Sequence, residues 1–150
     1  MTGDGKTRYI PREDVLLAQP LTWCVRMPGY WLVKTEPSTY SFDDLEREGV
    51  ATWDGVKNPV AMKHLRAMQP GDEAFVYHTG NEKAVVGMAQ VVAAGDPPRF
   101  KAVRRLARAV TLAEIKQDKA FADWALVRIG RLSVMPVPPA LYRRLLALAG

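Results

Sequence analysis

The sequence predicts a small α+β domain, either a mixed barrel or a sheet, in which short strands alternate with short helices. Three observations lead to this class. Apolar runs bounded by Gly and Pro recur along the chain, capped helical segments separate them, and no apolar run approaches the about 20 residues of a membrane-spanning helix. Of the 150 residues, 48% are hydrophobic and 25% are charged, which is typical of one globular domain with a sizeable core.

Four segments have the composition of strands. They are rich in β-forming residues, and Gly, Pro or Asn lies near their ends. We expect strands over residues 30–34, 73–79, 84–93 and 131–137, with the second and third joined by a turn at 80–83. The pattern of residues 100–110 fits a strand or a helix and does not decide between them.

Capping residues predict the helices. Ser41, Asn58 and Thr111 each have the side-chain oxygen that an N-cap uses, and Glu114 completes a capping box with Thr111. We therefore expect helices over residues 42–48 and 59–69 and from 111 onward, a helical turn at 118–124, and a last helix from Pro138 and Pro139 through residue 149.

The first 28 residues differ from the rest. Three prolines interrupt them, and they show neither sustained periodicity nor a signal-peptide pattern. We expect residues 1–28 to be a poorly ordered extension to a domain over 29–150, with Met27 as the natural start and little contribution to stability. The single cysteine, Cys24, excludes an internal disulfide and fits a reducing cytoplasm.

Positive charge is concentrated in the last third of the chain. Residues 1–98 contain 10 Lys/Arg and 13 Asp/Glu, whereas residues 99–150 contain 11 and 3. A one-sided basic surface is typical of a protein that binds a polyanion, although a solvated surface explains such a run equally well. The densest stretch holds no acid and consists of Arg99, Lys101, Arg104, Arg105 and Arg108.

The segment from Trp53 to Pro59 is the most informative one. Asn58 as N-cap and Pro59 as first helical residue place Trp53 and Asp54 in a loop just before a helix. An aromatic face beside a hydrogen-bond acceptor can hold a flat heterocycle. The alternative is that Trp53 is a core anchor and Asp54 a turn residue, and both interpretations stay open on local evidence.

Two further polar groups follow strands. Tyr77, His78 and Thr79 end one predicted strand, and Lys34, Thr35 and Glu36 end another. Strand ends beside loops often present polar groups to ligands. The alternatives are that His78 is a hydrogen-bonded rim residue and that Lys34 and Glu36 form only a weak exposed ion pair.

Little in the sequence favours catalysis or a cofactor. The two histidines, His64 and His78, are 14 positions apart, and no His/Cys cluster has metal-ligand spacing. No glycine-rich phosphate loop follows a strand. We expect neither a metal nor a cofactor.

The chain resembles the EVE domain family, which has a PUA-like fold. The resemblance covers about residues 30–148, and the matching stretches recur in the family's order. They are residues 30–37 (YWLVKTEP), 53–59 (WDGVKNP), 65–72 (LRAMQPGD), 77–80 (YHTG), 86–87, 126–128 and 131–137.

The resemblance implies a curved PUA-like β-barrel with short helices at its ends and a cavity for a modified nucleobase, such as a methylated cytosine, in DNA or RNA. We expect a monomer that flips the base into this cavity and holds phosphates with the basic stretch. We also expect Trp53 to be a partly exposed wall on which the base stacks, because a closed core would exclude the charges of Asp54 and Lys57. We expect the polar edge of the base to be read by Asp54, Asn58 or Thr79. The cavity residues carried over by motif are Trp31, Lys34, Thr35, Glu36, Trp53, Asp54, Val56, Lys57, Asn58, Tyr77, His78 and Thr79.

Two points stay open beside this resemblance. The same cavity could serve a small-molecule or nucleotide hydrolase, with Glu36 or His78 as acid or base. The chain is also about ten residues shorter than family members usually are after Asp96, so one barrel strand is shortened or is supplied by residues 100–110.

Overall fold

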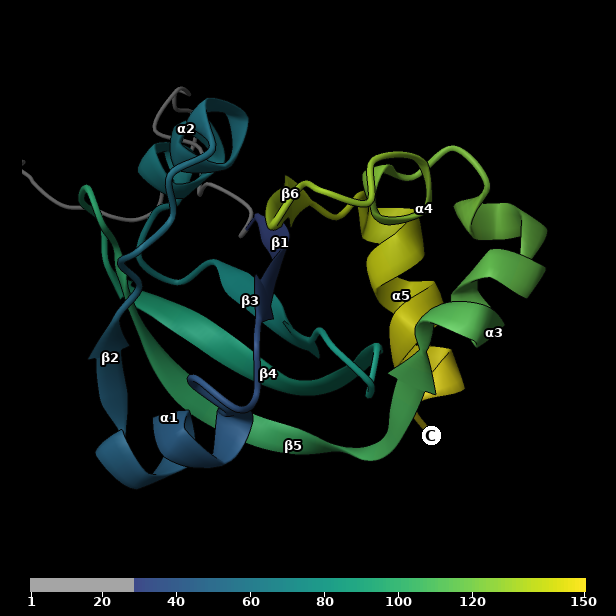
Figure 1. Cartoon of the computed structure of the whole chain (residues 1–150), viewed down its shortest axis with the longest axis horizontal. Coiled ribbons are helices and arrows are strands. Elements are labelled where there is room, and N and C mark those ends of the chain that lie inside the picture. Colours follow the sequence, from purple (N-terminus) through teal and green to yellow (C-terminus); the bar gives the residue numbers. More distant parts are fainter. Residues whose placement is uncertain (1–28) are drawn as a thin grey trace, which may run out of the picture.

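The computed structural model describes residues 29–150, and the expectations for residues 1–28 lie outside the described residues. Within 29–150, a curled six-stranded sheet is surrounded by five short α-helices (Figure 1). None of the helices in this part of the chain is long and apolar enough to cross a membrane. The expected α+β class and curved sheet are confirmed.

The strands form one mixed sheet. They are β1 (Tyr30–Thr35), β2 (Val50–Thr52), β3 (Glu73–His78), β4 (Ala84–Ala93), β5 (Arg99–Thr111) and β6 (Val134–Pro136). Their order is β2-β5-β4-β3-β1-β6, and only β1 and β3 run parallel. Because parallel strands end at the same edge, Thr35 lies opposite His78, and the two polar strand ends meet as the sequence predicts.

The helices lie at two ends of the sheet. They are α1 (Phe42–Glu48), α2 (Pro59–Ala67), α3 (Leu112–Gln117), α4 (Ala125–Arg128) and α5 (Pro139–Leu148), with a 3₁₀ turn over Lys119–Phe121. Figure 1 shows α1 and α2 beside β2 and the other three at the opposite end. The predicted caps are present: Ser41 and Thr111 form capping boxes, and the Asn58 side chain accepts from the N–H groups of Val60 and Ala61.

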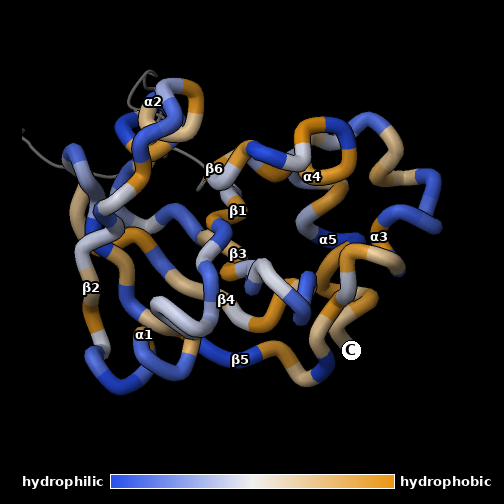
Figure 2. Tube along the Cα trace, viewed as in Figure 1, coloured by the Kyte–Doolittle hydropathy of each residue, from blue (hydrophilic) through white to orange (hydrophobic). Residues whose placement is uncertain are grey.

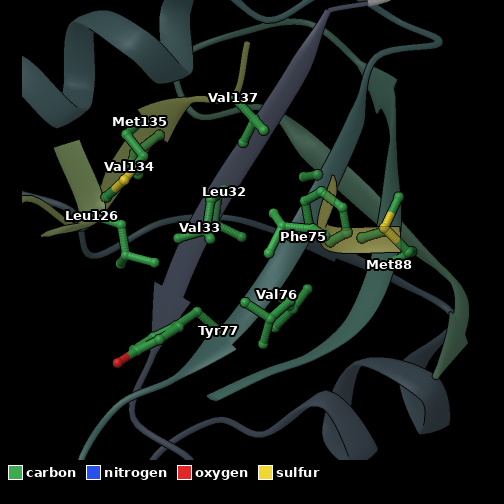
Figure 3. Packing of buried hydrophobic residues seen from close by; sticks show 14 of the residues in the cluster. Leu32, Val33, Phe75, Val76, Tyr77, Met88, Leu126, Val134, Met135 and Val137 are labelled. Carbon is green, nitrogen blue, oxygen red and sulfur yellow. The ribbon is translucent and has the colours of Figure 1, made fainter. Parts of the chain in front are cut away.

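The core fills both faces of the central strands. Leu32, Phe75 and Met88 are cross-strand neighbours on β1, β3 and β4, and Val33 and Val76 form the equivalent row on the other face (Figure 3). All five are at most 3% exposed. In β3 this double-sided burial continues to its last residue, which makes β3 the rigid centre of the fold.

Helix α1 packs unusually close to the sheet. A Cβ atom at Gly87 would lie 2.5 Å from the ring of Phe42, so only glycine allows this approach. The guanidinium of Arg105, which is paired with Gly87 in the sheet, lies 5.2 Å from the centroid of the same ring. Phe42 is therefore held between α1 and the sheet at a site where β4 has no side chain.

Some elements differ from the sequence expectations. Residues 100–110 belong to a strand of 13 residues, β5, which also pairs with β2, a strand that the sequence did not predict. The strand expected over 131–137 is limited to β6, and α4 was not predicted. Figure 2 shows a hydrophilic stretch in the middle of β5, where its basic residues lie.

Candidate functional site

A pocket of about 700 Å³, which we call the main pocket, opens on the surface of the described residues. It lies where the end of β1, the segment that leads into α1, and the loop after β2 come together. It is lined by Lys34, Thr35, Glu36, Thr39, Tyr40, Glu48, Ala51, Thr52, Trp53, Asp54, Gly55, Val56, Lys57 and Ser133. Seven of the 12 residues that the resemblance assigned to the cavity are therefore brought together here.

Trp53 lines this pocket but is only 7% exposed. Its ring packs edge-on against Phe100, with centroids 5.3 Å apart, and against Tyr40, with centroids 6.1 Å apart. The expectation of a partly exposed cage wall is thus wrong. Trp53 is a core residue that also forms part of the pocket wall, because its backbone N–H is fixed to Pro98 O and its side chain turns inward.

Several polar side chains of the main pocket are available to a ligand. Asp54, Lys57 and Ser133 make no side-chain hydrogen bond or ion pair with any residue between 29 and 150. The carboxylate and ammonium groups of Asp54 and Lys57 are exposed and face water in the absence of a ligand. Among the described residues the pocket thus offers an unpaired carboxylate, an unpaired ammonium group and three unbonded hydroxyls, those of Ser133, Thr39 and Thr52.

Other polar groups of the pocket are held by the protein. The Thr35 hydroxyl donates to Tyr40 O at 2.6 Å, and the Tyr40 hydroxyl donates to Glu48 Oε1 at 2.6 Å. Burial, followed by the hydrogen bond to the Glu48 carboxylate, raises the pKa of Tyr40, so this hydroxyl stays protonated. These contacts make a rigid wall between β1 and α1.

Glu36 is exposed and accepts from both the backbone N–H and the hydroxyl of Ser38. These two hydrogen bonds, the backbone one first, lower the pKa of Glu36. A carboxylate that is stabilised in its charged form is a poor general acid at neutral pH. Its position supports a role in shaping the pocket edge more than the proton transfer considered in the sequence analysis.

His78 does not line the main pocket. It is 5% exposed, its Nε2 accepts from the backbone N–H of Phe42 at 3.0 Å, and its Nδ1 lies 2.7 Å from Glu82 Oε1. Since Nε2 accepts, the proton lies on Nδ1 and is donated to Glu82. Both ring nitrogens hold the fold together, in accordance with the hydrogen-bonded alternative, and neither is free for acid–base chemistry.

Trp31 and Asn58 are also absent from the pocket lining. The indole N–H of Trp31 donates to Asp72 Oδ2 at 3.0 Å, at the opposite end of β1. The side-chain oxygen of Asn58 caps α2. The motif resemblance assigned both to the cavity, whereas the structure gives each a local structural contact.

Tyr77 and Thr79 lie beside the main pocket, in a smaller one of about 220 Å³ that we call the lysine pocket. Lys34 lines both pockets, so they share a wall. The lysine pocket is lined by Lys34, Tyr77, Thr79, Gly80, Lys83, Leu112, Lys116, Leu126, Val127 and Gly130. Of the three expected residues at the end of β3 that the main pocket lacks, it therefore holds two, Tyr77 and Thr79, and not His78.

The basic stretch on β5 does not form one free surface. Arg105 pairs with Asp43 and Glu46 of α1, and Arg108 pairs with Glu114 and donates to Leu148 O at 2.8 Å. Arg99, Lys101 and Arg104 have no ion pair within the described residues. Lys101 and Arg104 line a third pocket, of about 430 Å³, together with Glu73, Met88, Gln90, Ala102, Val103 and Tyr142.

Sequence reasoning missed several lining residues. Tyr40 and Glu48 flank α1, Ser133 precedes β6, and Lys83 and Lys116 come from a turn and from α3. Only the spatial arrangement brings these segments together, and none carries a recognisable motif. No group of three metal-ligating side chains was found among residues 29–150.

A family model described as the EVE domain matches residues 29–148. This chain belongs to the EVE domain family. The match begins with the first described residue and includes every strand and helix described above. The sequence resemblance and the PUA-like fold are thus confirmed.

Curated relatives of this EVE domain include thymocyte nuclear protein 1 from several vertebrates. The Rattus norvegicus protein is 37% identical over 78 residues, which cover 44% of this chain and 34% of the rat protein. The Danio rerio protein is 26% identical over 181 residues, covering 91% of this chain and 78% of that protein. The match thus spans about a third of the first of these relatives.

Solved structures share the fold over most of the described chain. A protein from Agrobacterium tumefaciens has a TM-score of 0.79 at 31% identity, and one from Rhodopseudomonas palustris has 0.77 at 37%; each comparison covers 81% of this chain and 93% of the other. The human THYN1 protein, solved in complex with DNA that contains 5-methylcytosine, has a TM-score of 0.73 at 26% identity. This comparison covers 81% of this chain and 97% of the human chain.

Proposed function

We propose that this EVE domain binds a modified base, with 5-methylcytosine in DNA as the first candidate, in the main pocket and does not transform it. The observation that carries the proposal is the main pocket itself, which combines a wall that includes a fixed indole with polar groups that have no protein partner. A volume of about 700 Å³ falls within the about 300–1,000 Å³ usual for ligand pockets. The human neighbour bound to methylated DNA supports the choice of ligand.

The pocket residues have separate roles in this proposal. Trp53, held edge-on by Phe100 and Tyr40, supplies a preorganised aromatic surface for the base. The Asp54 carboxylate accepts from the exocyclic amine of the base, because it is the free acceptor beside that indole. Asn58 is not assigned this role, since its oxygen already accepts two backbone N–H groups.

A binding role fits the state of the titratable groups better than a hydrolase does. Both ring nitrogens of His78 are engaged, and the pKa of Glu36 is lowered by Ser38. A general acid or base needs a free proton site and a pKa near the working pH. Incubation with 5-methyl-2′-deoxycytidine, followed by chromatography, is expected to return the nucleoside unchanged, and a product would contradict the non-catalytic role.

The binding proposal is tested with two DNA duplexes that differ only in one methyl group on one cytosine. The chain is expected to bind the methylated duplex more tightly in a fluorescence anisotropy titration. Asp54→Asn is expected to weaken that binding by roughly ten- to a hundred-fold, because a hydrogen bond to a charged group contributes about 1.5–3 kcal/mol. Asp123→Asn, a change of an exposed carboxylate that lines none of the three pockets, is the matched control. Equal affinity for both duplexes would contradict the proposal.

A further inference from the structure

The lysine pocket concentrates positive charge that the protein does not neutralise. Lys34, Lys83 and Lys116 all line its about 220 Å³, and none forms an ion pair with a residue in the described part of the chain. Like charges gathered around a small volume repel one another. Such an arrangement is favourable when an anion occupies the space between them.

The Tyr77 hydroxyl in the same pocket has no partner among the described residues. Tyr77 is 3% exposed, yet its hydroxyl makes no hydrogen bond to any residue from 29 to 150. In Figure 3 this hydroxyl points away from Leu32, Val33 and Val76, on the side of the cluster where Leu126 lies. A hydroxyl that has no partner in the described structure and lines a pocket with three lysines can donate to an acceptor in that pocket.

The surrounding contacts favour an oxygen anion. The Lys34 ammonium lies 5.6 Å from the centroid of the Tyr77 ring and donates to Gly130 O at 3.0 Å, which leaves further protons to donate. Desolvation lowers the pKa of Lys34, so a bound anion would offset a cost that the protein already bears. Within residues 29–150, the only carboxylate bonded to a side chain of the lining is that of Glu36, which accepts from the Thr79 hydroxyl at 3.3 Å.

The third pocket is a weaker candidate for the same ligand. Lys101 and Arg104 line it, but so does Glu73, whose carboxylate accepts from the Tyr142 hydroxyl at 2.7 Å. An anion bound there would lie beside a carboxylate inside the pocket. The lining of the lysine pocket contains three ammonium groups and no acidic side chain.

We propose that the lysine pocket binds a backbone phosphate next to the modified nucleotide, which is an inference that rests on the proposed function. The two pockets share Lys34, so a base in the main pocket brings the phosphates on either side of it close to the lysine pocket. Lys34, Lys83 and Lys116 donate to the phosphate oxygens, and the Tyr77 hydroxyl supplies a fourth donor. The contact positions the strand, and the base contacts supply the selectivity.

The test is a double-mutant cycle in which substitutions in the protein are combined with uncharged linkages in the DNA, and the affinity of each combination is measured. The DNA probes are a duplex with one 5-methylcytosine and two copies of it in which a single methylphosphonate replaces the phosphate on the 5′ or the 3′ side of that nucleotide. The proteins are the full chain and its Lys83→Gln, Lys116→Gln and Tyr77→Phe variants, with Lys119→Gln as control. Lys119 is an exposed lysine that lines none of the three pockets.

One of the two neutral linkages is expected to weaken binding by the unchanged chain about three- to ten-fold. Each pocket variant is expected to bind the normal duplex about three- to ten-fold more weakly than the unchanged chain does. The same neutral linkage should cause no further loss of affinity in these variants, because the substitution and the linkage remove the same contact. Lys119→Gln should keep the full linkage effect. Independent losses that multiply, or no effect of either linkage, would overturn the inference. If the chain does not distinguish the methylated duplex from the unmethylated one, the proposed function itself fails and the inference fails with it.

Discussion

The two ends of the parallel pair β1–β3 use polar residues in opposite ways. At the amino end, Asp72 is 0% exposed and accepts from Gly29 N at 2.9 Å, from Trp31 Nε1 at 3.0 Å and from Gln69 N at 3.0 Å. At the carboxyl end, Tyr77 is 3% exposed and its hydroxyl has no partner within residues 29–150, and the nearby Lys83 has no ion pair with any of these residues. Polar groups that bond one another stabilise the fold, whereas polar groups left unbonded indicate a place for a ligand.

The same contrast separates two tryptophans that the motif resemblance treated alike. Trp31 and Trp53 were both assigned to the cavity. The Trp31 indole N–H is bonded to Asp72, and its ring lies 6.0 Å from that of His64 near α2. Trp53 lines the main pocket next to the unbonded Asp54. The two tryptophans therefore differ in the neighbouring carboxylate, which is bonded at Trp31 and unbonded at Trp53 within the described residues.

Replacing Trp53 tests the comparison most severely, because this residue belongs to the pocket and to the core. Trp53→Ala is expected to lower the free energy of unfolding by about 3–5 kcal/mol, since it removes a buried ring packed against Phe100 and Tyr40. Chemical denaturation measures this loss. Trp53→Phe is the milder control and should keep more of both stability and DNA binding. A fully stable Trp53→Ala protein would show that the ring is not an anchor.

Replacing Asp72 should affect stability without changing the selectivity for methylated DNA. Asp72→Asn keeps the shape but removes the charge and turns one acceptor atom into a donor that faces N–H groups. We expect a loss of about 2–3 kcal/mol in the free energy of unfolding, measured by urea denaturation. The ratio of affinities for methylated and unmethylated duplexes should stay constant below the unfolding transition. A changed ratio would contradict the division between the two ends.

Replacing Tyr77 should weaken DNA binding without lowering the stability of the fold. Tyr77→Phe removes only a hydroxyl that has no partner in the described structure, so the melting temperature is expected to stay the same or rise slightly. Affinity for the methylated duplex should fall about three- to ten-fold if a phosphate accepts from this hydroxyl. Calorimetry and anisotropy on the same preparation measure both. A clear fall in melting temperature would place Tyr77 with the structural polar residues.

The smallest effect is expected on β5. Arg105→Gln breaks ion pairs with Asp43 and Glu46 but should leave the salt dependence of DNA binding unchanged, because this guanidinium is already engaged. Arg104→Gln is the matched variant, since Arg104 has no ion pair among the described residues. If Arg104 contacts a phosphate, its loss lowers the slope of log affinity against log salt by about one unit. An equal change in both variants would contradict the distinction between paired and unpaired arginines.

Local signals predicted much of the fold. The caps at Ser41, Asn58 and Thr111 and the turn between β3 and β4 involve residues within a few positions of each other, so their chemistry is visible in the sequence. β2 was missed because three residues become a strand only by pairing with β5. The strand character of β5 was ambiguous because its pairing with β4 shifts register at three places, which breaks the two-residue period.

The site residues that belong to a sequence motif could be predicted, whereas contacts between segments far apart in the sequence could not. The ends of β1 and β3 were found because parallel pairing places both polar groups at one edge. The engagement of Arg105 was hidden because its partner Asp43 lies 62 positions away. Trp53 was expected at the surface because charged residues follow it, yet Asp54 and Lys57 extend into solvent while the indole turns inward.

The missing side chain at Gly87 has a consequence for the width of the main pocket. Phe42 occupies the space where a Cβ atom would be, and α1, which begins with Phe42, ends at Glu48 in the wall of the main pocket. A methyl group at position 87 would push α1 away from the sheet and widen the opening between Glu48 and β2. Position 87 lines none of the three pockets. A substitution at position 87 is therefore expected to change the width of the main pocket without touching anything bound in it.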